Sequence, residues 1–173
     1  MNRSNKQFKR YTLFILLLLT TLLGTAQVAG FNNREAGASI YPGWFDHKPF
    51  TSLADNLDQA EREGKLGVMV LFSTAECTYC DEFIRSSLSN PAVAATVQKH
   101  FRAVGMEIFA DPHTMNDASG TVRYSSEFAR QESSGYSPTI VFYGSDGKRI
   151  LRLVGYQSPE RFRRILDNIT GKL

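Results

Sequence analysis

Residues 67–80, with the sequence GVMVLFSTAECTYC, contain the features that decide the fold. The apolar residues from Val68 to Phe72 follow one another without a polar break, which predicts a strand buried on both faces of a sheet. Two cysteines separated by two residues come next, and apolar residues over 83–88 predict a helix directly after them. A buried strand that leads through C-x-x-C into a helix predicts an α/β domain with cysteine chemistry at a strand end.

Helices and strands alternate on both sides of this stretch. A helix is predicted over 52–64, because Ser52 begins a capping-box-like pattern and Gly64 suits a C-terminal cap. Alternating strands and helices imply parallel pairing, and a closing hairpin adds antiparallel strands. We therefore expect an α/β fold with a mixed central β-sheet flanked by helices. The other predicted segments are helices over 90–101, 126–133 and 158–169, strands over 104–109, 139–143 and 150–154, a loop over 110–121 and a turn over 145–148.

The N-terminus has the three parts of a secretory signal peptide. Residues 1–10 are polar and positively charged, residues 13–19 are fully apolar, and residues 24–26 offer the small side chains of a cleavage site. The apolar run is shorter than the roughly 20 residues of a membrane-spanning helix. We therefore expect residues 1–26 to be a signal peptide and the folded part to be periplasmic. An uncleaved signal that anchors the protein in the membrane is the alternative.

The positive charge of the chain belongs to its N-terminus. The 173 residues include 20 Lys and Arg against 17 Asp and Glu, a formal net charge of +3. Four of these cations lie within residues 1–10, so residues 27–173 carry 16 cations against 17 acids. Without a basic surface, the folded part is not expected to bind nucleic acid. We expect residues 27–50 to be an N-terminal extension, in which 40–45 form an edge strand or pack over the core, and residues 51–173 to be one domain.

The two cysteines, Cys77 and Cys80, have three interpretations. A structural zinc site needs four ligands, and the three histidines are scattered without a paired spacing, so we expect no metal. A purely structural disulfide would close a loop of only a few residues and would remove little entropy from the unfolded chain. A dithiol that cycles between its reduced and oxidised forms suits the position at a helix start better, and it needs no cofactor.

Cys77 is the predicted nucleophile of this pair. At the start of a helix, its sulfur lies near unpaired backbone N–H groups and the positive end of the helix dipole, which both favour the thiolate. The thiolate would attack a substrate disulfide. Cys80, one turn further along and more buried, would then resolve the mixed disulfide and release the reduced substrate.

Ser137-Pro138 stands at the entry to the predicted strand over 139–143. A proline there removes one donor of the sheet ladder, and a cis bond would leave the preceding backbone free to pair with an extended substrate beside Cys77. X–Pro bonds are mostly trans, but the combination with C-x-x-C leads us to predict a cis Pro138 as part of the catalytic site. The predicted substrate-binding residues are Ser137, Thr78 and Tyr79.

These features together resemble the thioredoxin superfamily. The likeness is carried by the apolar strand, the C-x-x-C pair, the S-P-T sequence over 137–139, the D-G-K turn over 146–148 and the amphipathic terminal helix. It covers residues 67–169 and implies a thioredoxin-like fold. By this resemblance the attacking thiol, the resolving thiol and the cis-proline are Cys77, Cys80 and Pro138.

Within the superfamily, the chain is most similar to periplasmic SoxW-type thioredoxins. Residues 90–91, the polar insert over 110–121 and the G-Y-Q-S-P sequence over 155–159 carry this finer likeness. It implies that the partners are thiol-carrying proteins of sulfur oxidation and a membrane thiol transporter that donates electrons. We expect the substrates to be protein disulfides or thiols, and the protein to be a monomer.

Four positions depart from cytosolic thioredoxins. Those proteins carry Trp before the first cysteine and Gly-Pro between the two, where this chain has Glu76 and Thr78-Tyr79. They also carry a buried acid six residues before the first cysteine, where this chain has Leu71. Removal of the proton from Cys80 must then use water, Glu76 or another group.

The charges around the motif bear on the direction of electron flow. A helix end stabilises a thiolate by about 0.3–1 kcal/mol, and repulsion from Glu76, Asp81 and Glu82 opposes it by a similar amount. No Lys, Arg or His lies between Phe72 and Ile84. A thiolate of modest stability favours a reductant or electron carrier, so we expect an exported thiol–disulfide reductase. The alternatives are a disulfide oxidase or isomerase, and a binding module whose cysteine pair is inert.

Overall fold

The computed structural model describes residues 40–47, 52–109, 114–133 and 135–171. The chain divides into residues 1–38 and 39–173, and every described element belongs to the second unit. The expected signal peptide therefore lies outside the described residues. Within the described part, no helix is both long and apolar enough to cross a membrane.

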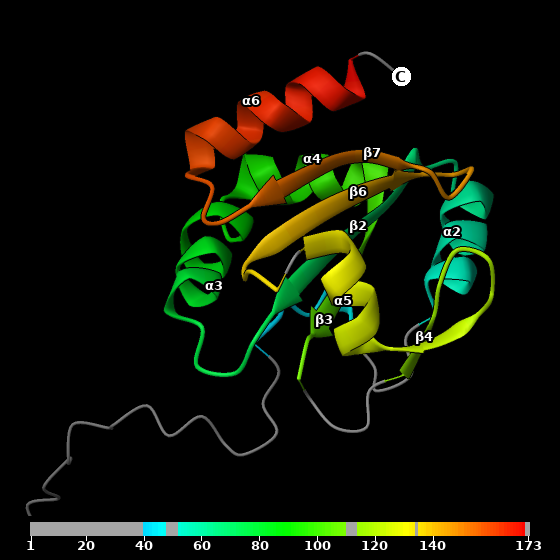
Figure 1. The fold of residues 1–173 in the computed structure, drawn as a ribbon. Coiled ribbons are helices and arrows are strands. Elements are labelled where there is room, and N and C mark those ends of the chain that lie inside the picture. Colours follow the sequence, from blue (N-terminus) through cyan, green and yellow to red (C-terminus); the bar gives the residue numbers. More distant parts are fainter. Residues whose placement is uncertain (1–39, 48–51, 110–113, 134, 172–173) are drawn as a thin grey trace, which may run out of the picture. The chain divides into compact units, whose positions relative to one another are not determined.

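One sheet contains five of the described strands, which are β1 (Phe45–Asp46), β2 (Gly67–Ser73), β3 (Phe101–Glu107), β6 (Thr139–Gly144) and β7 (Arg149–Val154). Their order across the sheet is β1-β3-β2-β6-β7 (Figure 1). β3 runs parallel to β1 and β2, whereas β6 runs antiparallel to β2 and β7. A helical crossover joins the parallel strands β2 and β3, and a tight turn joins β6 to β7. This arrangement confirms the predicted mixed sheet.

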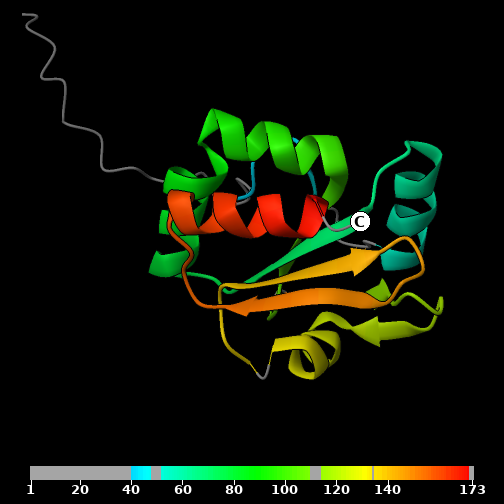
Figure 2. The same ribbon diagram turned by 90° about the horizontal axis from the view of Figure 1, so that it is seen from above.

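Helices cover both faces of the sheet, and they are α2 (Leu53–Arg62), α3 (Thr78–Glu82), the π-helical η1 (Phe83–Leu88), α4 (Pro91–His100), α5 (Ser125–Ser133) and α6 (Pro159–Thr170). η1, α4 and α6 pack on one face, and α2 and α5 pack on the other (Figure 2). In β2, Leu71 packs in the core on the face covered by η1, α4 and α6, whereas Val70 and Phe72 pack in the core on the face covered by α2 and α5. Successive side chains of a strand point to opposite faces, so one apolar run supplies both cores.

Three helices begin at polar residues that the sequence marks as caps. The Ser52 hydroxyl accepts the backbone N–H of Asp55 at 3.0 Å, which starts α2. The side chains of Asn90 and Ser158 accept backbone N–H groups in the same way at the starts of α4 and α6. Each cap satisfies an N–H group that has no partner within its helix.

The region from 110 to 121, expected to be a loop, contains part of a small hairpin. Its strands, β4 (Thr114–Asn116) and β5 (Val122–Tyr124), are antiparallel. The Asp117 carboxylate accepts the backbone N–H groups of Ser119 and Thr121, which closes the turn. Strands of three residues are too short for their alternation of polar and apolar side chains to be recognised, because a strand pattern is read over at least four residues. β3 also begins at residue 101 rather than at the expected 104.

Both expectations for residues 40–45 are met. Phe45 begins β1, which pairs with β3 at the edge of the sheet. Tyr41 and Trp44 pack against the core on the face covered by α4 and α6. Part of the expected N-terminal extension therefore contributes a strand and two aromatic side chains to the folded unit.

Candidate active site

Cys77 and Cys80 form a disulfide where β2 leads into α3, with their Cα atoms 5.2 Å apart. Cys77 is the N-cap residue of α3, and its sulfur accepts the backbone N–H of Cys80 at 3.1 Å. Cys77 is partly exposed, whereas Cys80 is completely buried. The predicted position at a helix start and the predicted difference in burial are both confirmed. One sulfur is therefore reachable from solvent and the other lies behind it.

The segment before β6 lies against the disulfide. Figure 1 shows the start of α3 beside the start of β6. The Ser137–Pro138 bond is cis, as predicted, and Pro138 is buried. The Ser137 hydroxyl oxygen lies 3.5 Å from the Cys77 sulfur. The structure thus brings together three of the residues that the sequence analysis singles out, although they are about 60 positions apart in the chain.

The two residues between the cysteines, Thr78 and Tyr79, are exposed. The Tyr79 side chain is 67% exposed, and Tyr136, which directly precedes Ser137, is 66% exposed. Large aromatic side chains are usually more buried than this, and two of them close in sequence to the site residues offer apolar area to a molecule that contacts the disulfide. Tyr136 is absent from the predicted site because no periodic pattern surrounds it.

Thr74 is a second residue that the sequence analysis misses. It follows β2 directly, and its hydroxyl lies 3.0 Å from the Ser137 hydroxyl. Ser137 therefore stands between Thr74 on one side and Cys77 on the other. In the sequence, Thr74 is marked only by its place directly after a buried strand. A threonine in that place is equally typical of an ordinary strand end.

Tyr41 fills space beside Leu71, the residue that stands in place of a buried acid. Leu71 is in register with Gly105, and the Tyr41 ring packs on the same face at Gly105. Its hydroxyl lies 2.6 Å from the hydroxyl of Ser73, the buried last residue of β2. Burial raises the pKa of Tyr41 well above its ordinary value, and the Ser73 hydrogen bond only partly opposes this. Tyr41 therefore stays protonated at neutral pH and does not replace the missing acid as a base.

Glu76, the other acid near the motif, is exposed and has a backbone φ of 56°. This left-handed conformation is uncommon for a residue with a side chain. It turns the chain between the end of β2 and the first cysteine.

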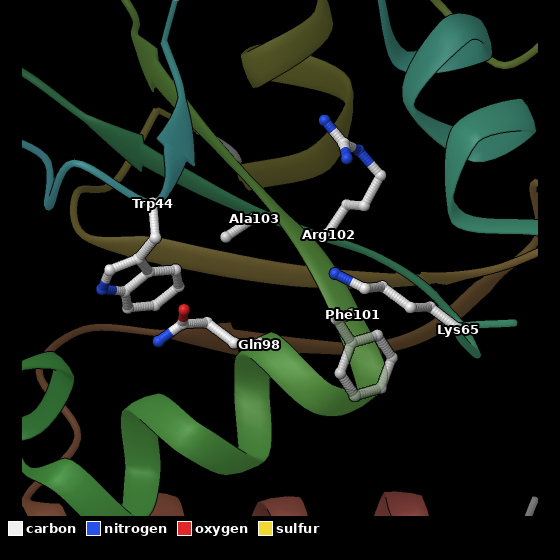
Figure 3. A pocket seen from close by; sticks show the side chains of 6 residues that line it. All are labelled: Trp44, Lys65, Gln98, Phe101, Arg102 and Ala103. Carbon is white, nitrogen blue, oxygen red and sulfur yellow. The ribbon is translucent and has the colours of Figure 1, made fainter. Parts of the chain in front are cut away.

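A separate pocket of about 160 Å³ lies at the other end of β3 (Figure 3), lined by Trp44, Lys65, Gln98, Phe101, Arg102 and Ala103. Its two cations are both paired with Glu63, at 3.0 Å for Lys65 and 2.7 Å for Arg102. Phe101, the first residue of β3, is in register with Gly67, the first residue of β2, so the pocket lies where both strands begin. The cysteines follow the last residue of β2, at the opposite end of the strand. The pocket is therefore not part of the disulfide site.

A family model described as "Thioredoxin-like domain" matches residues 53–170, which include both cysteines and the cis-proline. The chain belongs to the thioredoxin-like domain family. A thioredoxin-like domain with a C-x-x-C pair supports thiol–disulfide oxidoreductase chemistry.

Three solved structures share this thioredoxin-like fold. A thioredoxin-fold protein from Helicobacter pylori is 24% identical, with a TM-score of 0.60, over 77% of this chain and 83% of that one. A thioredoxin from Thermus thermophilus is 22% identical, with a TM-score of 0.56, over 75% and 89%. A disulphide isomerase from Xylella fastidiosa Temecula1 is 21% identical, with a TM-score of 0.51, over 67% and 86%. Among curated proteins, no significant match is found.

Proposed function

We propose that this chain is an exported thiol–disulfide reductase that uses the Cys77–Cys80 dithiol to reduce disulfides in other proteins. One observation carries the proposal. The disulfide joins a partly exposed cysteine that caps a helix to a buried cysteine three positions later. This asymmetry suits a cycle in which the outer sulfur meets the substrate and the inner sulfur completes the reaction.

The proposed reaction consists of two thiol–disulfide exchanges. The Cys77 thiolate attacks one sulfur of the substrate disulfide, which joins that sulfur to Cys77 and releases the other as a thiolate that takes a proton from water. Cys80 then loses its proton to water and attacks the Cys77 sulfur. This step forms the Cys77–Cys80 disulfide and releases the second substrate thiolate, which is protonated. The substrate gains two electrons and two protons, and the dithiol loses them.

The charges near Cys77 support reduction as the direction of electron flow. A strongly stabilised thiolate makes the dithiol form stable and the disulfide an oxidant. Around this motif the acids Glu76, Asp81 and Glu82 oppose the thiolate. The nearest following cation, Arg85, is paired with Glu82 at 3.2 Å, which reduces its influence. The dithiol is therefore expected to give up electrons readily.

The exposed side chains of Tyr79 and Tyr136 support a polypeptide as the substrate. Tyr79 follows Cys77 by two residues and Tyr136 directly precedes Ser137, so each is close in sequence to one of the two groups that face each other in the site. Aromatic side chains bury large areas at protein interfaces and are enriched there. A small disulfide would leave most of this surface unused.

We further propose that the protein acts in the periplasm, as a monomer, and receives its electrons from a membrane thiol donor. The N-terminal pattern of charged, apolar and small residues supports export, with an uncleaved membrane anchor as the alternative form. The SoxW-like sequence features support thiol-carrying proteins of sulfur oxidation as the partners.

Turnover and cellular redox state together test the proposal. The reduced full chain should reduce the disulfides of insulin, and Cys77→Ser should abolish this activity. In the native host, trapping thiols with a mass tag should find the protein mostly reduced. A mostly oxidised pool together with an oxidising potential would instead indicate an oxidase or isomerase. A disulfide that resists mild dithiols would indicate a binding module with an inert pair.

A further inference from the structure

The Cys77 sulfur lies near a pair of hydroxyl groups that contact each other. The Ser137 oxygen is 3.5 Å from that sulfur, and the Thr74 oxygen is 3.0 Å from the Ser137 oxygen. The first hydroxyl comes from the segment before β6 and the second from the residue after β2. Because β2 and β6 are neighbours in the sheet, the pair of strands holds the two hydroxyls together.

The direction of the hydrogen bond between Thr74 and Ser137 decides whether Ser137 can donate to the Cys77 sulfur. Each hydroxyl donates one proton and can accept others. If Ser137 donates to Thr74, it has no proton left for the sulfur. If Thr74 donates to Ser137, the Ser137 proton is free to point at Cys77. The second arrangement suits a thiolate, because hydrogen bonds to a charged acceptor are about twice as strong as neutral ones.

We propose that Thr74 is a positioning residue: it donates its proton to Ser137 and so directs the Ser137 proton toward the Cys77 thiolate. The inference deepens the proposed function, since it concerns the reactivity of the same sulfur. Thr74 does not touch Cys77 itself in this account. Its effect passes through Ser137, and the bond that Thr74 donates also polarises the bond that Ser137 donates.

Thr74 is suited to this task by its place in the chain. It directly follows the fully buried Ser73, so its backbone is held by the end of the central strand. The Cys77 sulfur has one further donor in the site, the backbone N–H of Cys80 at 3.1 Å. That donor is independent of Thr74 and remains when the hydroxyls are removed.

The test is the pH profile of Cys77 alkylation by iodoacetamide in the reduced full chain, with Cys77 and Cys80 resolved by peptide mass spectrometry. Ser137→Ala should raise the midpoint pH of the alkylation profile, and at pH values below that midpoint it should slow alkylation of Cys77 about tenfold. Thr74→Val should slow it roughly threefold. Thr74→Ser keeps the hydroxyl and should restore the wild-type profile. Thr96→Val removes a helix hydroxyl that bonds Ala92 in α4, and it should change nothing.

A double variant separates positioning from a structural role. In the Ser137→Ala background, Thr74→Val should add no further slowing, because its route to the sulfur is gone. An equal slowing in both backgrounds, an unchanged profile in Thr74→Val, or no rescue by Thr74→Ser would each overturn the inference. Thr74→Ala carries the same expectation if the valine variant does not fold. Insulin reduction by the wild-type chain is measured alongside, so that a failure of the proposed function is distinguished from a failure of this inference.

Discussion

Tyr41 packs against Gly105 so closely that a Cβ atom at Gly105 would lie 2.5 Å from Cγ of the tyrosine ring. The hydroxyl of the same tyrosine reaches Ser73, four residues before Cys77 in the chain. Tyr41 thus joins the segment before β1 to the end of the central strand that leads into the disulfide. The absence of a side chain at Gly105 makes this contact possible.

Gly105→Ala is expected to destabilise the fold by about 1–3 kcal/mol, because the added methyl group must displace the Tyr41 ring from a packed site. Urea unfolding measures the change. Gly43→Ala is the matched control, since a Cβ at Gly43 meets no atom within 4 Å. Equal urea midpoints for Gly105→Ala and Gly43→Ala would show that the Tyr41 ring moves aside without loss of stability.

Tyr41→Phe is expected to cost about 1–2 kcal/mol, since it removes the partner of a buried Ser73 hydroxyl. It should also change the response to alkaline pH. The folded-state pKa of Tyr41 is raised by burial, so its contribution to stability is complete below the unfolded pKa of about 10 and falls as the pH rises above it. Thermal unfolding between neutral and alkaline pH should therefore show a shallower decline for Tyr41→Phe than for wild type. Parallel declines would contradict this assignment.

Glu63→Gln is expected to destabilise the protein by under about 1 kcal/mol at neutral pH, because the ion pairs of Glu63 are partly exposed to solvent. Hydrogen bonds from Gln59 and Lys65, with the charges of Arg102 and Lys65, lower the pKa of Glu63 to about 2. Its contribution is therefore complete above the unfolded value of 4.5 and is lost as the pH falls from there toward 2.

The difference between wild type and Glu63→Gln should accordingly shrink in acid, and also in high salt. Urea unfolding at neutral and acidic pH measures it. Glu61→Gln, at an exposed position of the same helix, is the control for removing a negative charge. A difference that persists unchanged at pH values near 2 would count against the ion-pair account.

Tyr136→Ser is expected to raise KM for insulin about three- to tenfold, because an aromatic side chain supplies roughly 1 kcal/mol or more at an interface. Reduction of oxidised glutathione should be almost unchanged, since that substrate is too small to need the same contact. Tyr124→Ser, at a tyrosine 62% exposed on β5, is the control. Equal losses with both disulfides would mean that Tyr136 acts on the sulfur chemistry instead.

The sequence predicted the elements whose local signals agree with their final environment. The unbroken apolar run from Val68 to Phe72 favoured a central strand. Ser52 and Asn90 mark helix starts by the hydrogen bonds they make. Cys77 and Pro138 were recognised because C-x-x-C directly follows a buried strand and a proline stands at the entry to another. Their proximity in the folded chain is a consequence of the pairing between β2 and β6.

Residues whose importance depends on distant partners could not be predicted. Thr74 gains its role only from Ser137, 63 positions later, and Tyr41 gains its own from Gly105 and Ser73. Pairwise spacing in a sequence carries no information on such contacts. The hairpin of β4 and β5 could not be predicted for a different reason, since strands of three residues are too short to show a recognisable alternation.

Capture of a mixed disulfide on Cys77 tests the central claim most directly. The reduced Cys80→Ser variant is mixed with insulin, and intact and peptide mass spectrometry locate any adduct. The account predicts that an insulin chain is joined to Cys77 and is released by dithiothreitol, with none captured by a variant in which Cys77 is also serine. An unmodified Cys77 in the reduced, folded variant, or full turnover by Cys77→Ser, would contradict it.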